Sequence, residues 1–518
     1  MILINSSTRD SLKIFQPFLP ISPPVGIGCL LAFAQLKNIK TKFIDEQIED
    51  NVLGVISEYV KDLQQPYIFG FSVLTAAFKK AVLLSKELKR AYPNSLIVFG
   101  GIHPTALPED TLSYGHIDVV VRGEGENALV ELYKCIKGGK DYTHLDNLSY
   151  RSNGRIVHNR ISQNSVSLDD LPDFPYYLFK SKRYNSGLVL SSRGCPYRCI
   201  FCSNRVTSGK KYKFCSTKRI IRDLDFIYNQ YYERGGKVNA GFADDNLLVN
   251  KERIYELIDE LKRKGLDKKF TFSFQARGDN VNYKLLEDMY DAGFRNIFFG
   301  LETASEKIMK FIKKDETVAQ CAEAVKMAKR IGFNVSATFI YGFPGETHND
   351  RMNCLKLSKE LKLDMVRYNN ATPYPGTELY EIAKSENRLK IIGLFENFNS
   401  VSVFIEAPFN EIPFSYVPIG SSEKEIRNDL LYSYFDFYFN FNKIKKAFMG
   451  QGKGTGWFNA GETTISLISK VPALLLLAVN MSIKFYKLFL DLIIEKILNF
   501  IFLLPALDSF RGLLMKER

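Results

Sequence analysis

The sequence predicts an α/β protein with a doubly wound parallel sheet, then a partial (β/α)6 barrel, then a mainly helical C-terminal region. Three observations predict this class. Short β-branched runs alternate with amphipathic helical stretches over the first third of the chain, which is typical of a parallel sheet with helices on both faces. The same alternation resumes near residue 186 and continues through six units. Beyond about residue 400 the sequence is aromatic-rich and compatible with helices.

The first unit is placed at residues 1–145. Ligands of doubly wound sheets bind beyond the carboxyl ends of the strands, and small or polar residues follow the expected strand ends here. The strands are expected at 2–4, 41–44, 67–70, 96–99 and 117–121, with a helix at 76–92 among the connections. The residues at their ends include Asp45, Ser72, Thr75, Gly100, Gly101, His103, Gly123, Glu124, Gly125 and Glu126.

Residues 146–182 are expected to form a hairpin and an irregular, proline-bearing linker, and the barrel unit is placed at 183–400. Chemistry in such barrels concentrates at the carboxyl ends of the strands. The barrel strands are expected at 188–190, 238–242, 270–275, 296–300, 335–340 and 365–368. Their ends carry Asp244, Asp245, Gln275, Arg277, Glu302, Gly342 and Gly345.

Three cysteines follow the first barrel strand within eight residues: Cys195, Cys199 and Cys202. Thiolates at this spacing can hold three irons of a cubane cluster and leave the fourth iron open, whereas electron-transfer clusters usually have a full set of protein ligands. A closed zinc site with Cys215 as a distant fourth ligand is the alternative. The other cysteines are scattered singly, which favours buried thiols in a reducing, cytoplasmic compartment; they are Cys29, Cys135, Cys215, Cys321 and Cys354.

The cysteine pattern, with Phe201 before its last cysteine, resembles the signature of the radical S-adenosylmethionine enzymes. In that family S-adenosylmethionine chelates the open iron of a [4Fe-4S] cluster, and one-electron reduction yields a 5′-deoxyadenosyl radical. The resemblance implies that the strand-end residues bind this cofactor. They are Phe201, Asp244 and Asp245 (near the methionine moiety), Gln275, Arg277 (carboxylate), Glu302 (ribose), and Gly342 and Gly345 (adenine).

The turns of the first unit, taken together, are similar to the Rossmann-like cobalamin-binding domain that precedes many such barrels. Glycine turns allow a close backbone approach to a large macrocycle. The loop at residues 45–50 lacks the histidine that ligates cobalt in many of these domains, so no axial ligand is expected from it, and binding of cobalamin is left open. The resemblance implies that cobalamin meets Ser72, Thr75, Gly100, Gly101, Gly123, Glu124 and Gly125, with His103 along the corrin edge or tail.

The last unit, 401–518, contains an unusually apolar stretch at 465–507. Its run at 471–483 is too short to span a bilayer. The residues that follow place Lys484, Lys487, Asp491, Glu495 and Asn499 on one narrow stripe at helical spacing, with apolar residues elsewhere. Burial against the protein or a partner and an in-plane, peripheral membrane position are both left open. Tyr432, Tyr434 and Tyr438 are candidates for either core or pocket.

The family resemblance implies methylation of an unactivated carbon in a small-molecule or lipid-like substrate, with a low-potential electron donor such as flavodoxin or ferredoxin. A cyclase or oxidase without net methylation, and a non-catalytic iron–sulfur protein, are the alternatives. A methylthiotransferase acting on tRNA is disfavoured, because the first unit lacks a set of extra cluster cysteines. The net charge of +13 is spread over the chain, so no nucleic-acid partner is predicted.

Overall fold

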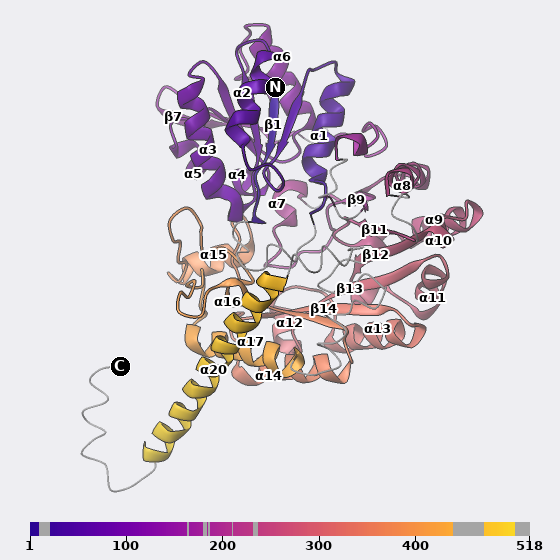
Figure 1. Cartoon of the computed structure of the whole chain (residues 1–518), viewed down its shortest axis with the longest axis vertical. Coiled ribbons are helices and arrows are strands. Elements are labelled where there is room, and N and C mark those ends of the chain that lie inside the picture. The colour runs from indigo at the N-terminus through magenta and orange to yellow at the C-terminus, as the bar shows by residue number, and fades with distance from the viewer. Residues whose placement is uncertain are drawn as a thin grey trace.

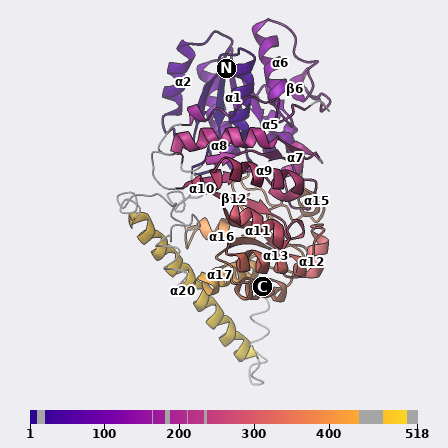
Figure 2. The ribbon, with the colours of Figure 1, turned by 90° about the vertical axis from the view of Figure 1, so that its right-hand side faces the viewer.

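The computed structural model describes residues 1–9, 21–162, 165–179, 184, 187–209, 211–231, 237–438 and 471–502. Two large sheets organise these residues, and Figure 1 shows the unit built on the first sheet above the unit built on the second. Figure 2, turned by 90°, shows the same stacking, with α20 running down the outside of the lower unit. The fold class predicted from the sequence is confirmed.

The first sheet has seven strands in the order β2-β1-β3-β4-β5-β6-β7, and the strands from β2 to β5 are parallel. The order reverses between β1 and β3, where doubly wound sheets bind their ligands. The strands are β1 Ile2–Asn5, β2 Lys42–Asp45, β3 Ile68–Ser72, β4 Leu96–Gly100, β5 Val119–Val121, β6 Leu148–Ser152 and β7 Arg155–His158. The helices are α1 Val25–Leu36, α2 Val52–Lys61, α3 Phe78–Ala91, α4 Ile102–Ala106, α5 Pro108–Ser113 and α6 Glu126–Lys137.

The expected hairpin forms, but its place in the linker segment 146–182 is corrected. Strand β6 pairs antiparallel with β5, so the hairpin adds two strands to the first sheet. The physical reason is that β5 would otherwise expose a row of unpaired backbone groups at the edge of the sheet.

The second sheet has six parallel strands in the order β15-β14-β13-β12-β11-β8, as a partial barrel requires. They are β8 Gly187–Val189, β11 Val238–Phe242, β12 Phe270–Ala276, β13 Phe294–Glu302, β14 Asn334–Tyr341 and β15 Met365–Asn370. The connecting helices are α7 Asn204–Ser208, α8 Thr217–Tyr231, α9 Lys251–Arg263, α10 Leu266–Lys269, α11 Tyr283–Asp291, α12 Glu306–Phe311, α13 Val318–Ile331 and α14 His348–Glu360. A short antiparallel pair, β9 Ser192–Arg193 and β10 Lys213–Phe214, flanks the cysteines.

The two units share their cores. One cluster of buried side chains runs from the first sheet through the second, and a smaller one covers the other face of the first sheet. Residues from beyond the barrel complete the smaller cluster: Tyr380 in α15 (Glu378–Ser385), and the buried rings of Phe395 and Phe398. The chain therefore returns to the first unit after the barrel is finished.

Helix α17 (Glu423–Tyr438) closes the free edge of β15, beside the short helix α16 (Ser402–Ile405). The Tyr434 hydroxyl accepts a hydrogen bond from the Tyr368 N–H at 3.0 Å, and the Tyr438 hydroxyl bonds the N–H and carbonyl of Val366 at 3.0 and 2.8 Å. These two tyrosines are therefore core residues that satisfy an edge strand, whereas Tyr432 is partly exposed.

The apolar C-terminal stretch forms the long helix α20, Val471–Phe502. Its predicted ends at 465–470 and 503–507 lie outside the described residues. Within the part of the chain that is described, none of the helices combines the length and apolar character needed to cross a membrane.

Candidate functional site

The cysteine loop, residues 194–203, joins β9 to α7 beyond the end of the first barrel strand. Buried Ile200 anchors it: the Ile200 N–H donates to the Ile312 carbonyl at 3.0 Å, and the Ile200 carbonyl accepts from the Leu379 N–H at 2.9 Å. Gly194 has a φ of 84°, and a Cβ there would lie 2.1 Å from a backbone carbonyl oxygen. Only glycine therefore allows the chain to turn into this loop.

The thiols of Cys195, Cys199 and Cys202 are free and half-buried. Burial raises the pKa of Cys199 to about 11 and the pKa of Cys202 to about 12. The cations of Lys314 and Arg277 lie close enough to oppose this rise at Cys199. Because metals bind the thiolate, ligation must displace protons from these thiols. Three neighbouring free thiols beside two buried cations fit an anionic cluster held at one corner.

Cys215, the candidate fourth zinc ligand, lies apart from this arrangement. It is 1% exposed, belongs to the apolar core, and its thiol contacts the Leu190 carbonyl oxygen at 3.9 Å. The remaining four scattered cysteines are also buried, as expected from the sequence. The donor set therefore does not fit a closed four-cysteine zinc site.

Arg277 follows β12 and lies directly against the cysteine loop. Its guanidinium is 3.5 Å from the ring centroid of Tyr197, a residue of that loop. The Arg277 Nε and Nη2 donate to the Asp279 carboxylate at 3.0 and 2.9 Å, and Nη2 also donates to the Lys314 carbonyl at 2.5 Å. Among the described residues Nη1 has no hydrogen-bond partner, so it is the donor available to a ligand carboxylate.

Glu302 ends β13 at a bulge. The pairing register shifts between Gly300 and Glu302, and Glu302 has a φ of 62°. A left-handed backbone at a non-glycine residue costs roughly 1–3 kcal/mol, and bulges commonly re-aim a side chain. Here the carboxylate folds back over Gly300, where a Cβ would lie 2.2 Å from the Glu302 Oε1 atom.

A buried lysine holds this carboxylate. Lys314 is 4% exposed, and its Nζ lies 3.3 Å from Glu302 and 3.1 Å from Glu316. Burial acts to lower the pKa of Lys314, but the two carboxylates outweigh it and raise that pKa above its usual value. Lys314 and Glu316 were missed from the sequence, because a run of four charged residues at 313–316 is typical of a solvated turn.

Replacing Lys314 with methionine is expected to destabilise the protein and weaken S-adenosylmethionine binding. The change leaves the Glu302 carboxylate buried without its cation, which costs about 3–5 kcal/mol, whereas Glu316 keeps Arg277 at 3.9 Å. Denaturant unfolding and equilibrium binding of S-adenosylmethionine measure the two effects. The matched control is Lys313→Met, because Lys313 pairs with Glu378 at the surface, where a salt bridge contributes at most about 1 kcal/mol. If the two variants lost equal amounts of stability and of S-adenosylmethionine affinity, Lys314 would not be the cation that holds Glu302 in place.

The two adjacent aspartates after β11 have different environments. Asp244 is buried and accepts hydrogen bonds from the Ser191 N–H at 3.0 Å, the Ser191 hydroxyl at 2.6 Å and the Ser192 hydroxyl at 2.5 Å. Its carboxylate therefore braces the chain that leads into the cysteine loop, and the expected contact of Asp244 with the cofactor stays a prediction. Asp245 keeps part of its surface open to solvent and lines the cavity beside that loop, where the loss of water around its carboxyl raises its pKa.

The turn after β14 meets the cysteine loop through aromatic rings. Phe343 lies 5.6 Å from Phe201 between ring centroids. Gly342 and Gly345 have φ values of 96° and 74°, which this turn requires. The Gly342 N–H donates to the Glu346 carboxylate at 2.5 Å, so it is not available to adenine as expected. Gln275 is exposed at the end of β12, on the strand face that also carries polar Ser273.

A cavity of about 310 Å³ lies between the two units, at the carboxyl edge of the first sheet. The first sheet contributes small residues to its wall, and the barrel unit contributes Asp245 together with Arg193, Gly194 and Asn204, which flank the three cysteines. At Gly26 a Cβ would meet no atom within 4 Å, and at Gly123 its nearest neighbour would be 3.7 Å away. These positions form a cradle that larger side chains would fill. The predicted residues brought together here are Ser72, Gly100, Gly101, Gly123, Glu124, Gly125 and Asp245.

His103 and Thr75 are not among the residues that line this cavity, and their expected contact with cobalamin stays a prediction. The His103 ring is fully buried, 4.0 Å from Phe78 and 4.7 Å from Phe395 between centroids, and its Nδ1 lies 3.4 Å from the Thr75 hydroxyl. Burial lowers the pKa of His103 to about 3. A turn residue was expected to face the ligand, but the aromatic rings that cover it come from distant parts of the sequence.

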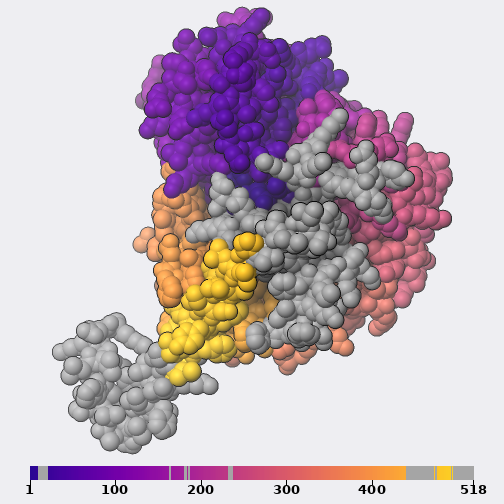
Figure 3. Space-filling view, viewed as in Figure 1, coloured from indigo at the N-terminus to yellow at the C-terminus, as the bar shows by residue number. Residues whose placement is uncertain are grey.

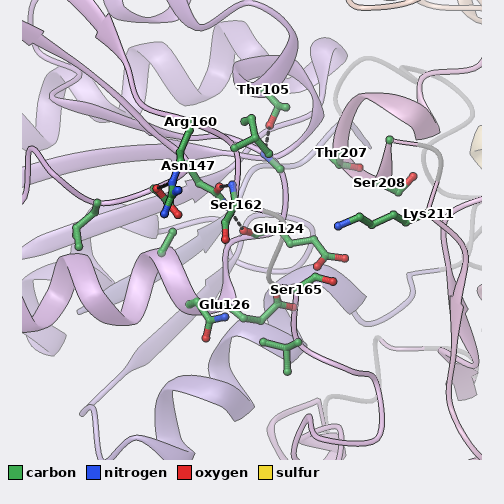
Figure 4. Close-up of a pocket in the computed structure, with 18 of the residues that line it drawn as sticks. Thr105, Glu124, Glu126, Asn147, Arg160, Ser162, Ser165, Thr207, Ser208 and Lys211 are labelled. Atoms are coloured by element: carbon green, nitrogen blue, oxygen red, sulfur yellow. Dashed lines mark hydrogen bonds and ion pairs between the residues drawn. The ribbon is translucent and has the colours of Figure 1, made fainter.

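A second cavity, of about 720 Å³, adjoins the first and shares Gly123, Glu124 and Thr207 with it. Figure 4 shows its polar lining, with Lys211 pointing inward from the barrel side opposite Glu124. The space between the units is therefore larger than the first cavity alone. Its position beside the glycine turns suits the bulky peripheral groups of a large cofactor.

Two ion pairs join the units, and both of their carboxylates belong to residues that line these cavities. The Arg193 guanidinium lies 2.6 Å from the Glu126 carboxylate, and the Lys213 Nζ lies 2.6 Å from the Glu124 Oε2 atom. Both cations belong to the β9–β10 pair that flanks the cysteine loop. The glycine turn and the cysteine loop are thus held at a fixed separation, and Glu124 acts as part of this clamp.

Fold and site together define a class: a parallel ligand-binding sheet closed onto a cysteine loop at the mouth of a partial barrel. Residues 189–358 match the model of the radical SAM superfamily, and residues 15–133 match the B12 binding domain. The chain belongs to the radical S-adenosylmethionine enzymes that carry a cobalamin-binding domain.

The chain is 34% identical over 395 residues to an uncharacterized methyltransferase of Pyrococcus horikoshii, covering 75% of this chain and 84% of that protein. It is 25% identical over 430 residues to an anaerobic magnesium-protoporphyrin IX monomethyl ester cyclase of Cereibacter sphaeroides, covering 80% and 66%. Its fold resembles that of OxsB, solved with aqua-cobalamin and S-adenosylmethionine, with a TM-score of 0.67, 18% identity and coverage of 98% and 82%.

Family membership implies a [4Fe-4S] cluster, S-adenosylmethionine and cobalamin as cofactors. The residues present fit all three. The cysteine loop offers three free thiols, the adjoining strand ends offer Arg277 and Glu302, and the glycine cradle leaves room at the seam.

Proposed function

We propose that this protein transfers a methyl group to an unactivated carbon of a small-molecule or lipid-like substrate. The observation that supports the proposal is the cavity between the units, because the glycine turns of the first sheet and the residues that flank the cysteines, Arg193, Gly194 and Asn204, line it together. A relative named as a methyltransferase, 34% identical over 75% of this chain, supports the same reaction class.

In this proposal Cys195, Cys199 and Cys202 hold the cluster, and Arg277 and Glu302 orient S-adenosylmethionine above it. The glycine turns would hold the corrin, and the loop at residues 45–50 would offer no histidine to the cobalt. We also keep the unit limits 1–145, 146–182, 183–400 and 401–518 as part of the proposal, with the hairpin strands β6 and β7 joined to the first sheet.

When bound, the cofactors supply a one-electron cleavage of S-adenosylmethionine and a transferable methyl group. The protein's residues exclude water and fix the geometry. The clamp formed by Arg193 with Glu126 and Lys213 with Glu124 keeps the two cofactor sites apart by a constant distance. A low-potential donor such as flavodoxin or ferredoxin would supply the electron.

Product counting tests the proposal. The anaerobically reconstituted protein, supplied with cobalamin, a reductant and candidate substrates, is expected to form 5′-deoxyadenosine and S-adenosylhomocysteine in equal amounts. One S-adenosylmethionine would be split with one electron from the donor into methionine and 5′-deoxyadenosine, whose 5′-methyl group gains one hydrogen atom from the substrate. A second loses its methyl group and becomes S-adenosylhomocysteine.

A cyclase or oxidase without net methylation is the second candidate, because the chain is also 25% identical over 80% of its length to a cyclase. That activity would give 5′-deoxyadenosine without S-adenosylhomocysteine. If reduced protein forms neither product, the methyltransferase proposal fails in favour of a non-catalytic iron–sulfur protein.

A further inference from the structure

Helix α20 turns its polar side toward the protein. The Lys484 Nζ is buried and donates to the Val403 carbonyl at 2.7 Å. Lys487 pairs with Glu411 at 2.7 Å, and Asp491 lies 3.9 Å from the Lys424 Nζ atom. The body of the molecule therefore provides partners for the polar stripe at Lys484, Lys487 and Asp491.

The opposite side of α20 is apolar and faces outward. Its exposed face, named here the outer face, has side chains that are 44–70% exposed: Leu475, Leu476, Val479, Tyr486, Leu490 and Ile493. Most of these residues recur at intervals of three, four or seven positions, so they share one side of the helix. Figure 3 shows α20, in yellow, on the outside of the molecule.

This arrangement is the reverse of an ordinary surface helix, which buries its apolar stripe and exposes its polar one. An exposed apolar patch of this length indicates that the outer face binds another surface, such as a protein or a membrane. The outer face is a straight ridge on a helix of 32 residues. In Figures 1 and 2 the far end of α20 projects beyond the barrel unit, where a broad flat surface can reach it.

The charge of the chain favours an anionic lipid surface as the partner. The protein has a net charge of +13, and the sequence between α17 and α20, residues 439–470, has five lysines and one glutamate. The same segment carries Trp457, the only tryptophan of the chain. Basic residues with aromatic and apolar ones are typical of helices that lie in a membrane interface.

We propose that α20 binds the surface of an anionic lipid bilayer, with its outer face in the boundary between headgroups and acyl chains. The protein body then lies on the aqueous side, bonded to the polar stripe. This position holds the barrel unit beside the membrane. The proposal does not depend on the reaction catalysed, since it concerns binding alone.

Vesicle flotation of the full chain tests this proposal. Wild-type protein is expected to float with phosphatidylglycerol–phosphatidylcholine vesicles and to bind pure phosphatidylcholine vesicles more weakly. The triple variant Leu475→Gln, Val479→Gln, Leu490→Gln is expected to lose at least about tenfold in partitioning, since apolar area drives this binding. The control variant Phe409→Gln, Ile419→Gln alters two other exposed apolar residues, which lie outside α20, and is expected to bind like the wild type.

A second variant reports on the outer face without removing apolar area. Tyr486→Trp, in a Trp457→Phe background, is expected to fluoresce at shorter wavelength on anionic vesicles and to be quenched by brominated lipid. Flotation without quenching at position 486 would overturn the proposal, since another surface would then bind. So would failure of the wild type to float, or a dimer in solution that the triple variant abolishes, which would identify a second copy as the partner.

Discussion

Cys199→Ala is expected to abolish reductive cleavage of S-adenosylmethionine. Cys199 lies between Cys195 and Cys202 in the sequence, and the backbone of the next residue, Ile200, is hydrogen-bonded through both its N–H and its carbonyl. Neither of the other two thiols can therefore move into its place. Loss of a residue that merely supports a metal ligand costs about 10–100-fold in affinity or activity, so loss of a ligand itself should exceed this. Iron content and 5′-deoxyadenosine formation by anaerobically reconstituted protein measure the effect.

The matched control for this variant is Cys215→Ala. Cys215 is buried in the apolar core, where removing its sulfur should cost about 1 kcal/mol of stability. Iron content and cleavage are expected to stay near the parent level. If Cys215→Ala lost its metal as completely as Cys199→Ala, the site would have four cysteine ligands and the open-iron interpretation would be wrong.

Gly26→Phe is expected to block cobalamin binding while leaving the rest of the protein intact. Gly26 lines the cavity between the units near the start of α1, and a Cβ there would meet no atom within 4 Å. The side chain would therefore start in open space and extend into the cavity. Replacing a helical glycine should also raise stability slightly, by roughly 0.5–1 kcal/mol at most.

The expected result is a loss of at least about tenfold in cobalamin affinity, or about 1.4 kcal/mol. Cobalt retained after incubation with hydroxocobalamin and desalting measures it, and formation of 5′-deoxyadenosine should persist. Gly115→Phe is the control, since Gly115 is also open to space but lies outside the cavity. Cobalt retention by Gly26→Phe at the parent level would show that the corrin binds elsewhere.

The strands and the cysteine loop could be predicted because their signals are local. Each of the parallel strands is a short apolar run, and the three cysteines are neighbours in sequence. The local sequence does not show which side of the sheet a turn residue will face. His103 follows a strand end as expected, yet Phe395, almost three hundred positions later, covers it.

Charged residues were also hard to place from the sequence, because the fold decides which groups pair with them. Asp244 and Lys314 are both buried, and a single sequence does not show which charges will find partners. Asp244 accepts hydrogen bonds from two serines that precede the cysteine loop. Lys314 pairs with Glu302, at the end of β13, and with Glu316. The same limit applies to α20, where the polar stripe was predicted but the surface it faces depends on tertiary contacts.

The return of the chain to the first unit after the barrel has a consequence for biosynthesis. Domains usually fold in order as they leave the ribosome, but Tyr380, Phe395 and Phe398 belong to the apolar cluster that covers one face of the first sheet. That face stays open to solvent until these late residues have been translated. The amino-terminal unit is therefore begun first and completed last.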